Sequence, residues 1–346
     1  MRSCLNMLTP LRPFFPILYQ GSNRRDSYFE GWYFKSSTKT SVSSSGRART
    51  VSFIPGISRS RAGDHAFVQM IDGASGKTRY FSFPVSEFSA KDNPFQVCIG
   101  SNSFSFSGLK AELKDEEGTV SAELDFGRMT PPRRSILKPG VMGPYSFVPF
   151  MECYHGIASL DHAVDGFVSF TNAGDGSEER IIFDGGRGYI EKDWGTSMPS
   201  CWVWIQTNTF LEAVGPASFF FSLARIPWHR SFFNGFISIL FFGGHEYRFA
   251  SYTGARLELF EVSGRFIRIL LADGKTKLEV QVRRNREGFL AAPVDGAMDR
   301  RIAESADSSV RVVLKQRHGS VDIPLFDSTS AASGVEVVGD TASLMP

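Results

Sequence analysis

Short runs of aromatic and β-branched residues, each followed by a turn signal, make up most of this chain. The segments 267–271 and 278–282 flank Asp273 and Gly274 and predict a β-hairpin. Helical periodicity is confined to one short segment, 298–306, which we expect to form a helix. The regular spacing of strands and turns predicts an all-β fold of antiparallel barrels or sandwiches. Further strand-like runs are 29–34, 66–70, 80–83 and 104–106.

The length and the turn signals together predict two lobes. A chain of 346 residues is too long for a single small core. A glycine-rich transition at Asp184, Gly185 and Gly186 gives the boundary between them. The first β-lobe is therefore expected over 28–183 and the second over 184–326.

Four segments are expected to be irregular. Residues 1–27 should form an N-terminal extended segment, and the small polar residues of 327–346 predict a disordered tail. The serine-rich stretch 36–50 predicts the loop of a hairpin. Five prolines in 130–149 predict an extended connection on the surface.

The aromatic content adds a cavity to this picture. The chain contains 32 Phe, 5 Trp and 9 Tyr, so that aromatic residues make up 13% of it. Ordinary packing of sheet cores accounts for most of these side chains. The remainder are numerous enough to line a large apolar pocket.

Charge and motifs exclude several classes of function. The net charge of +2 arises from 38 basic and 36 acidic residues, which gives no basic surface for nucleic acid. Signatures of nucleotide binding and of serine hydrolases are missing. The four cysteines form no CxxC pair and have no zinc spacing. We therefore expect no metal, no cofactor and free thiols in a reducing compartment.

The N-terminal sequence does not resemble a signal peptide. Pro10, Pro13 and Pro16 interrupt its apolar stretch, and no small-residue cleavage site follows. Runs of apolar residues long enough to cross a bilayer are missing. We expect a cytoplasmic protein whose contact with membranes, where it occurs, is peripheral.

Polar, ionisable and aromatic residues are concentrated in three blocks. These are YFEGWYFK at 28–35, GPYSFVPFMECYHGIASLDHAV at 143–164 and GYIEKDWGTSMPSCWVWIQTN at 188–208. The blocks resemble signature segments of the tocopherol cyclase family. The segments 244–259 and 290–314 extend the resemblance, so that it runs in order from about Tyr28 to Leu314.

The resemblance implies both a fold and an activity. The implied fold is two lipocalin-like antiparallel β-barrels in tandem, related to carotenoid hydratase and AttH-type proteins. The implied activity is closure of a chromanol ring on a prenylated benzoquinol. Such a reaction needs a general acid in a dry site, an acceptor for the phenol proton and stabilisation of a carbocation.

Asp193 is the first candidate for the acid. On a strand, Glu191 and Asp193 share one face while Lys192 points away. Two neighbouring carboxyls push one pKa upward, which suits a proton donor. An ion pair between Glu191, Lys192 and Arg187 is the structural alternative. Candidate cavity residues nearby are Trp194, Trp202 and Trp204.

Glu152, His155 and His162 form a second candidate cluster. Glu152 follows an apolar run, and a buried glutamate needs a partner. It could orient His155 or act as the acid itself. The structural alternative is a buried hydrogen bond that joins two strands, and a single histidine is more often structural than catalytic.

The remaining candidates would bind substrate. Glu30, Trp32 and Tyr33 lie beside a glycine that permits close backbone approach, and Glu30 could instead pair with an arginine. Gln206 and Asn208 could donate hydrogen bonds to a quinol hydroxyl, or belong to an ordinary polar face.

Three functions are consistent with these residues. The leading hypothesis is a cofactor-independent cyclase with a hydrophobic small-molecule substrate, a prenylated quinol. The second is a carrier that binds a prenyl lipid without turnover. The third is a hydratase, in which water captures the cation. Acidic residues in all three polar blocks favour an enzyme, because a carrier gains nothing from desolvated carboxyls.

Overall fold

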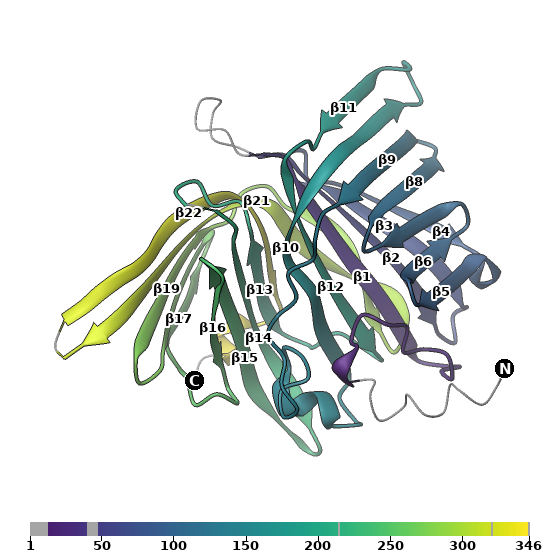
Figure 1. Ribbon diagram of the computed structural model, residues 1–346. Helices are drawn as coiled ribbons and strands as arrows, with labels where there is room; N and C mark the ends of the chain where they lie inside the picture. Colours follow the sequence, from purple (N-terminus) through teal and green to yellow (C-terminus); the bar gives the residue numbers. More distant parts are fainter. Residues whose placement is uncertain (1–12, 40–47, 214, 320, 345–346) are drawn as a thin grey trace.

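Two large antiparallel sheets make up the protein. The computed structural model describes residues 13–39, 48–213, 215–319 and 321–344. Figure 1 shows the first sheet, coloured purple to teal, beside the second sheet, coloured green to yellow. The described part of the chain contains no α-helix, only short 3₁₀ helices. The predicted all-β fold of two lobes in tandem is confirmed.

The first sheet has the strand order β4-β3-β2-β1-β12-β10-β9-β8-β7-β6-β5, and β11 pairs with β10. Its strands are β1 (Tyr28–Ser37), β2 (Thr50–Arg59), β3 (His65–Asp72), β4 (Lys77–Phe83), β5 (Phe88–Asp92), β6 (Phe95–Ile99), β7 (Asn102–Ser105), β8 (Gly108–Asp115), β9 (Gly118–Phe126), β10 (Cys153–Asn172), β11 (Glu178–Ile182) and β12 (Gly186–Gly195). The 3₁₀ helices η3 (Val85–Glu87) and η4 (Gly143–Phe147) lie in its connections.

The second sheet has the order β16-β15-β14-β13-β22-β21-β19-β18-β17, and β20 pairs with β21. Its strands are β13 (Trp202–Thr207), β14 (Ala217–Trp228), β15 (Ser231–Phe242), β16 (His245–Ala250), β17 (Arg256–Ser263), β18 (Phe266–Ala272), β19 (Thr276–Arg283), β20 (Gly288–Val294), β21 (Ala297–His318) and β22 (Val321–Val338). The 3₁₀ helix η5 (Thr341–Leu344) follows β22.

Three hydrophobic clusters hold the lobes together. One fills the first lobe, around Trp32 and Phe34, and a second fills the second lobe, around Val203 and Phe221. The third joins the two sheets and contains side chains of both, including Tyr33 and Trp204. β1 is therefore buried on both faces, with residues 32 and 34 in the first core and residue 33 at the interface between lobes.

Several predicted boundaries differ from the structure. The change from first to second sheet falls between Gly195 and Trp202, not at 183/184, because β12 pairs with β1 and β10. The predicted helix at 298–306 is wrong, since these residues form part of β21.

The ends and loops also need correction. Residues 327–338 belong to β22 and pair with β21 and β13, so this part of the predicted tail is ordered. Residues 36–50 join β1 to β2 as a hairpin, although 40–47 lie outside the described residues. Of the predicted N-terminal segment, only 13–27 are described, and they contain turns. Within the described residues no helix has the length and hydrophobicity needed to cross a bilayer.

Candidate active site

A cavity of about 190 Å³ lies between the two sheets. β1, β10 and β12 contribute residues from the first sheet, and β13, β14 and β22 contribute them from the second. Most of the wall is apolar, which suits a hydrophobic ligand. Its ionisable and hydrogen-bonding side chains include Tyr33, Gln69, Glu152, His155, Glu191, Asp193 and Glu336.

Strand alternation explains which residues face this cavity. Successive side chains of a strand point to opposite faces. On β12, Glu191 and Asp193 line the cavity. Ile190, which lies between Tyr189 and Glu191, belongs to the hydrophobic core of the first lobe. On β13, Trp202 and Trp204 line the cavity in the same way. On these two strands the cavity is therefore lined by alternate residues.

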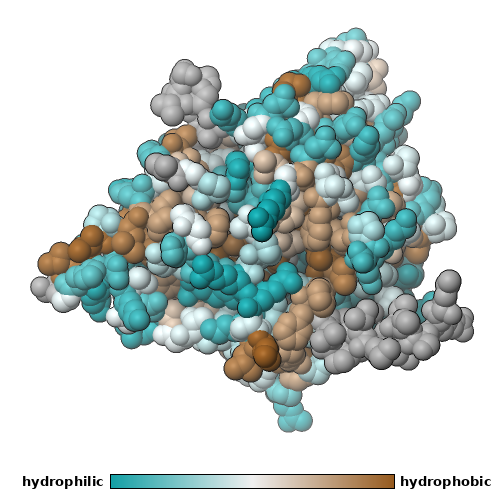
Figure 2. Space-filling model, in the orientation of Figure 1, coloured by the Kyte–Doolittle hydropathy of each residue, from teal (hydrophilic) through white to brown (hydrophobic). Residues whose placement is uncertain are grey.

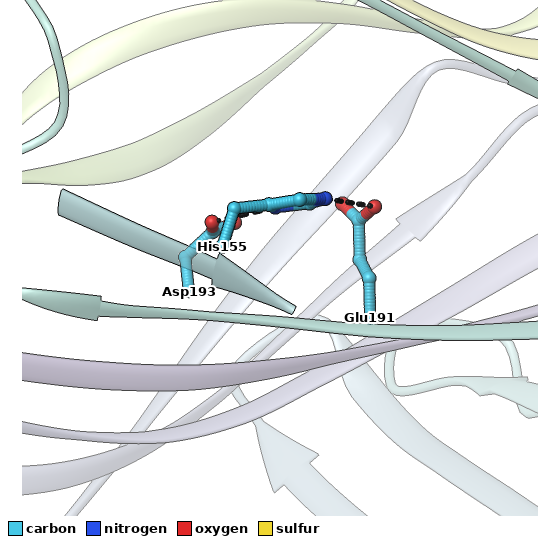
Figure 3. A group of neighbouring side chains, drawn as sticks. All are labelled: His155, Glu191 and Asp193. Carbon is cyan, nitrogen blue, oxygen red and sulfur yellow. Dashed lines mark hydrogen bonds and ion pairs between the residues drawn. The ribbon is translucent and has the colours of Figure 1, made fainter. Parts of the chain in front are cut away.

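His155 lies between two carboxylates. β10 and β12 pair so that His155 is directly opposite Asp193. Nδ1 of His155 is 2.8 Å from Oδ1 of Asp193, and Nε2 is 3.6 Å from Oε2 of Glu191. Figure 3 shows the imidazole ring with one carboxylate at each nitrogen. The ring also stacks on Phe220, with 5.2 Å between ring centroids.

The electrostatics of this cluster favour a charged imidazole. Burial opposes the charge, but Asp193 and Glu191 outweigh it and raise the pKa of His155 to about 9. Burial raises the pKa of Glu191 to about 7, although His155 and hydrogen bonds from Tyr189 and Trp204 act in the opposite direction. At neutral pH His155 is therefore an imidazolium ion whose Nδ1–H donates to Asp193.

A second pair of acidic residues lies on β21 and β22, and one of the two lines the cavity. Glu304 and Glu336 face each other across β21 and β22. Glu336 lines the cavity and accepts a 2.5 Å hydrogen bond from the indole N–H of Trp202. Burial and the charge of Glu304 raise the pKa of Glu336 well above its usual range. Burial and the nearby acidic charge therefore both favour the protonated form of Glu336.

Glu304 has a related environment but lies away from the cavity. Its Oε1 accepts a 2.5 Å hydrogen bond from the hydroxyl of Tyr33. Burial raises the pKa of Glu304 to about 7, against the effects of that hydrogen bond and of the charge of Lys35. Lys35 itself is fully buried, and burial lowers its pKa to about 7.

Sequence reasoning missed Glu304 and Glu336. Glu336 lay in the segment predicted to be a disordered tail, and Glu304 in the predicted helix. The alternation around Glu336 was the available signal, since Val335 and Val337 flank it as in a half-buried strand. The same pattern carries no information on its pairing with Glu304.

Comparison with known proteins identifies the family. The sequence model described as tocopherol cyclase-like matches residues 142–339, which is more than half of the chain. This chain belongs to the tocopherol cyclase-like family. The resemblance inferred from the polar blocks is thereby confirmed. Comparison with the sequences of curated proteins gives no match.

Solved structures match most of the length of this tocopherol cyclase-like protein. The crystal structure of CghA with Sch210972 has a TM-score of 0.54 and 12% identity, over 90% of this chain and 89% of that one. A putative AttH from Nitrosomonas europaea has a TM-score of 0.48 and 12% identity, over 91% and 93% of the two chains. Kievitone hydratase from Nectria haematococca has a TM-score of 0.45 and 11% identity, over 94% of each.

Seven of the candidate residues predicted from the sequence meet at the cavity of the tocopherol cyclase-like chain. Asp193, Glu191 and His155 form the cluster described above, and Glu152 lies further along the same wall. The other three are Tyr33, Trp202 and Trp204.

Glu30, Trp32 and Trp194 lie on the other face of β1 and β12. Glu30 forms a fully buried ion pair with Lys192 and accepts a 2.5 Å hydrogen bond from Tyr28. The indole N–H of Trp32 donates to the carbonyl oxygen of Ile17 at 2.7 Å. Trp194 stacks on Tyr154. These contacts are structural, and the ion pair of Glu30 is with Lys192 instead of an arginine.

His162, Gln206 and Asn208 also lie away from the cavity wall. His162 is buried beside Ser159, and burial lowers its pKa to about 3. Gln206 accepts a 2.8 Å hydrogen bond from Lys35, and Asn208 donates one of 2.8 Å to the carbonyl oxygen of Gly188. The geometry favours the structural interpretation of all three.

The His155 cluster also contains potential metal ligands. His155, Glu191 and Asp193 offer ligand atoms that lie within 4.8 Å of one another. Metal binding requires a neutral imidazole. Because the two carboxylates raise the pKa of His155 to about 9, a metal ion would have to displace a proton held in an ion pair. The cluster as it stands is better suited to holding a proton.

The buried acids predict how stability changes with pH. Since burial raises the pKa of Glu304 from 4.5 to about 7, the folded protein keeps a proton that the unfolded chain releases between these values. The contribution of Glu304 to stability is therefore lost as the pH rises through this window. The free energy of unfolding of the native protein should fall as the pH rises from 5 to 7. In Glu304→Gln this fall should be smaller by on the order of 2 kcal/mol.

Urea denaturation at several pH values measures this effect. Glu116→Gln, in an exposed turn, is the matched control, because the side chain of Glu116 stays in contact with solvent. An unchanged profile in Glu304→Gln would show that Glu304 titrates alike in the folded and unfolded states.

Proposed function

We propose that this protein closes a ring on a prenylated quinol by acid-catalysed addition of the phenol oxygen to the prenyl double bond. The observation that carries the proposal is the placement of a buried carboxyl, Glu336, whose pKa is raised by burial, and of the His155–Asp193 pair on the wall of one apolar cavity. Membership of the tocopherol cyclase-like family supports the same type of reaction.

Glu336 is the proposed proton donor. Protonation of an alkene needs an acid that stays protonated in a dry site, and burial provides that condition here. The O–H bond of Glu336 breaks as a C–H bond forms at the less substituted alkene carbon. The other carbon becomes a tertiary cation. The sequence pointed instead to Asp193, but that carboxylate accepts a hydrogen bond from the imidazolium of His155.

The His155–Asp193 pair acts on the phenol. The phenol oxygen attacks the cation and forms the C–O bond of the new ring, and its proton passes to the carboxylate of Asp193. His155 holds this carboxylate in place through the 2.8 Å hydrogen bond. One proton is consumed and one released, so the reaction is an isomerisation that needs no oxidant or reductant.

Aromatic rings on the cavity wall stabilise the cation. Trp202 and Trp204 both line the cavity, and the faces of aromatic rings attract positive charge. The indole N–H groups of Trp202 and Trp204 donate to Glu336 and Glu191 respectively, which fixes the orientation of both rings. Apolar neighbours such as Phe236 and Ile237 exclude water that would otherwise capture the cation.

A labelling experiment tests the proposal. The purified protein is incubated with a methyl-phytyl-benzoquinol in D₂O, and in a second reaction in ¹⁸O-labelled water, and the products are analysed by mass spectrometry. We expect a chromanol with one new deuterium on carbon and no ¹⁸O. Incorporation of ¹⁸O would identify a hydratase instead. Unchanged quinol that co-purifies with the protein would identify a carrier.

A further inference from the structure

A tight turn on the surface exposes two aliphatic residues. Ile136 and Leu137 are 82% and 75% exposed, which exceeds the exposure of the other large hydrophobic residues described. Ser135 and Lys138 close the turn with two backbone hydrogen bonds of 2.9 and 3.0 Å. Exposure of two adjacent aliphatic side chains at the tip of an ordered turn is costly in water and indicates a binding surface.

Basic residues surround this tip. Arg133, Arg134 and Lys138 are exposed, and Arg248 lies beside them in the same surface depression. Glu246, the acidic residue among those that line it, forms an ion pair with Arg248, which leaves the charges of Arg133, Arg134 and Lys138 in excess. Such a surface attracts anionic groups.

Backbone contacts hold the basic side chains in position. Arg134 donates to the carbonyl oxygen of Phe14 at 2.7 Å, and Arg133 to that of Gly244 at 3.1 Å. Because carbonyl oxygens carry no net charge, these contacts leave the positive charges of both guanidinium groups uncompensated.

The turn is continuous with the wall of the cavity. The chain runs from the turn into Met142 and Tyr145, which line the cavity. Tyr145 stacks on Phe233 from the hairpin of β14 and β15, with 5.5 Å between ring centroids. In Figure 1 this connection and the turn between β14 and β15 both lie at the lower edge of the molecule. Exposed aromatic residues on these segments are Phe147, Phe150 and Phe232.

The surface view agrees with this arrangement. Figure 2 shows hydrophobic residues, coloured brown, at the lower edge of the molecule, close to hydrophilic residues coloured teal. Phe150 packs on Trp228 at 5.2 Å, and Phe14 packs on Phe147 at 6.0 Å. Apolar surface therefore extends from the turn region toward the segment that contains Tyr145, which lines the cavity.

We propose that the turn 133–138 and the aromatic residues beside it form a docking surface for an anionic lipid bilayer. Ile136 and Leu137 insert between the acyl chains, while Arg133, Arg134 and Lys138 bind lipid phosphates. Burial of apolar side chains and attraction of basic residues to anionic lipids act together in peripheral binding. The charge complementarity distinguishes a bilayer from a purely apolar partner.

Docking in this orientation places Met142 and Tyr145, which line the cavity, near the bilayer. A prenylated substrate dissolved in the acyl chains could then enter the cavity without crossing water. This consequence depends on the proposed function, whereas vesicle binding does not.

Vesicle flotation tests the docking surface. The full-length protein is mixed, at low and at high salt, with vesicles of phosphatidylcholine alone or with vesicles of phosphatidylcholine that contain about 30% phosphatidylglycerol. We expect binding to the anionic vesicles that weakens as salt rises. Ile136→Ser/Leu137→Ser should weaken it by about tenfold or more, because both side chains lose their burial in the bilayer. Arg133→Gln/Lys138→Gln should weaken binding to anionic vesicles selectively.

A matched variant controls for loss of exposed apolar surface. Val321 and Ile323 are also exposed but lie in β22, at the far end of the second sheet in Figure 1. Val321→Ser/Ile323→Ser should bind vesicles like the native protein. Equal binding by native protein and by Ile136→Ser/Leu137→Ser, or failure of the native protein to bind vesicles, would overturn the proposal. Failure of the native protein to bind vesicles would favour a protein as the partner of this surface. Circular dichroism verifies that each variant is folded.

Discussion

Glu336→Gln is expected to lower the rate constant for ring closure by about 10²- to 10⁴-fold, the range typical of removing a general acid. Glutamine has the same shape as the protonated acid and can still accept the hydrogen bond from Trp202, so the cavity should keep its form. Substrate affinity should stay within about threefold of the native value, because the lost interaction acts in the transition state. Single-turnover kinetics with a prenylated quinol separate the two quantities.

Glu304→Gln is the matched control. Glu304 is opposite Glu336 in the pairing of β21 with β22, and burial raises the pKa of both. It lies outside the set of residues that line the cavity. Its rate constant should therefore fall much less than that of Glu336→Gln, since Glu304 acts on Glu336 through its charge alone, and the pH dependence of its stability should change.

Asp193→Asn distinguishes the two candidate acids. If Glu336→Gln retains most of the activity and Asp193→Asn incorporates no deuterium, the proton donor is Asp193, as the sequence suggested. If both variants lose activity while Glu304→Gln keeps it, the two residues act as acid and base in one reaction. The ¹⁸O experiment is independent of this assignment.

Lys192→Met is expected to lower the free energy of unfolding by about 3–5 kcal/mol, the usual cost of leaving one charge of a buried ion pair without its partner. Lys192 and Glu30 both have side chains that are 0% exposed. Lys192 also donates to the carbonyl oxygens of Pro16 and Leu18, at 2.9 and 2.5 Å. Its removal therefore leaves several acceptors without a donor, and urea denaturation measures the cost.

Two comparisons make this prediction specific. Lys110→Met breaks an exposed ion pair with Glu123 and should leave the unfolding midpoint unchanged within error. Glu30→Gln/Lys192→Met removes both charges and should recover part of the loss, since no unpaired charge stays buried. A Lys192→Met protein as stable as the native one would show that Glu30 is neutral in the fold.

Much of the fold could be predicted from local pattern. Turn-forming residue pairs such as Asp273-Gly274 and short aromatic runs predicted the all-β class and the hairpin of β18 and β19. These predictions were possible because strand and turn preferences act over a few residues. The alternation of side chains along a strand likewise placed Glu191 and Asp193 on one face, and both line the cavity. The polar blocks pointed to the family that the sequence model matches.

The predicted tail shows where local pattern was not sufficient. Its small polar residues look unable to form a core, yet β22 is stabilised by pairing with β21 and β13. Pairing partners more than a hundred residues distant, such as Trp202 and Val338, leave no mark in the local composition. Glu336 was missed for the same reason.

The sequence alone determined the all-β class, the family and the alternation that sorts each strand into two faces. Only the tertiary structure decided which of those faces lines the cavity. β1 and β12 are buried on both sides, so Glu30 and Tyr33 are indistinguishable by pattern, yet one pairs with Lys192 and the other with Glu304. Which face meets the second lobe depends on how two sheets pack, and this is settled by contacts between residues far apart in the chain.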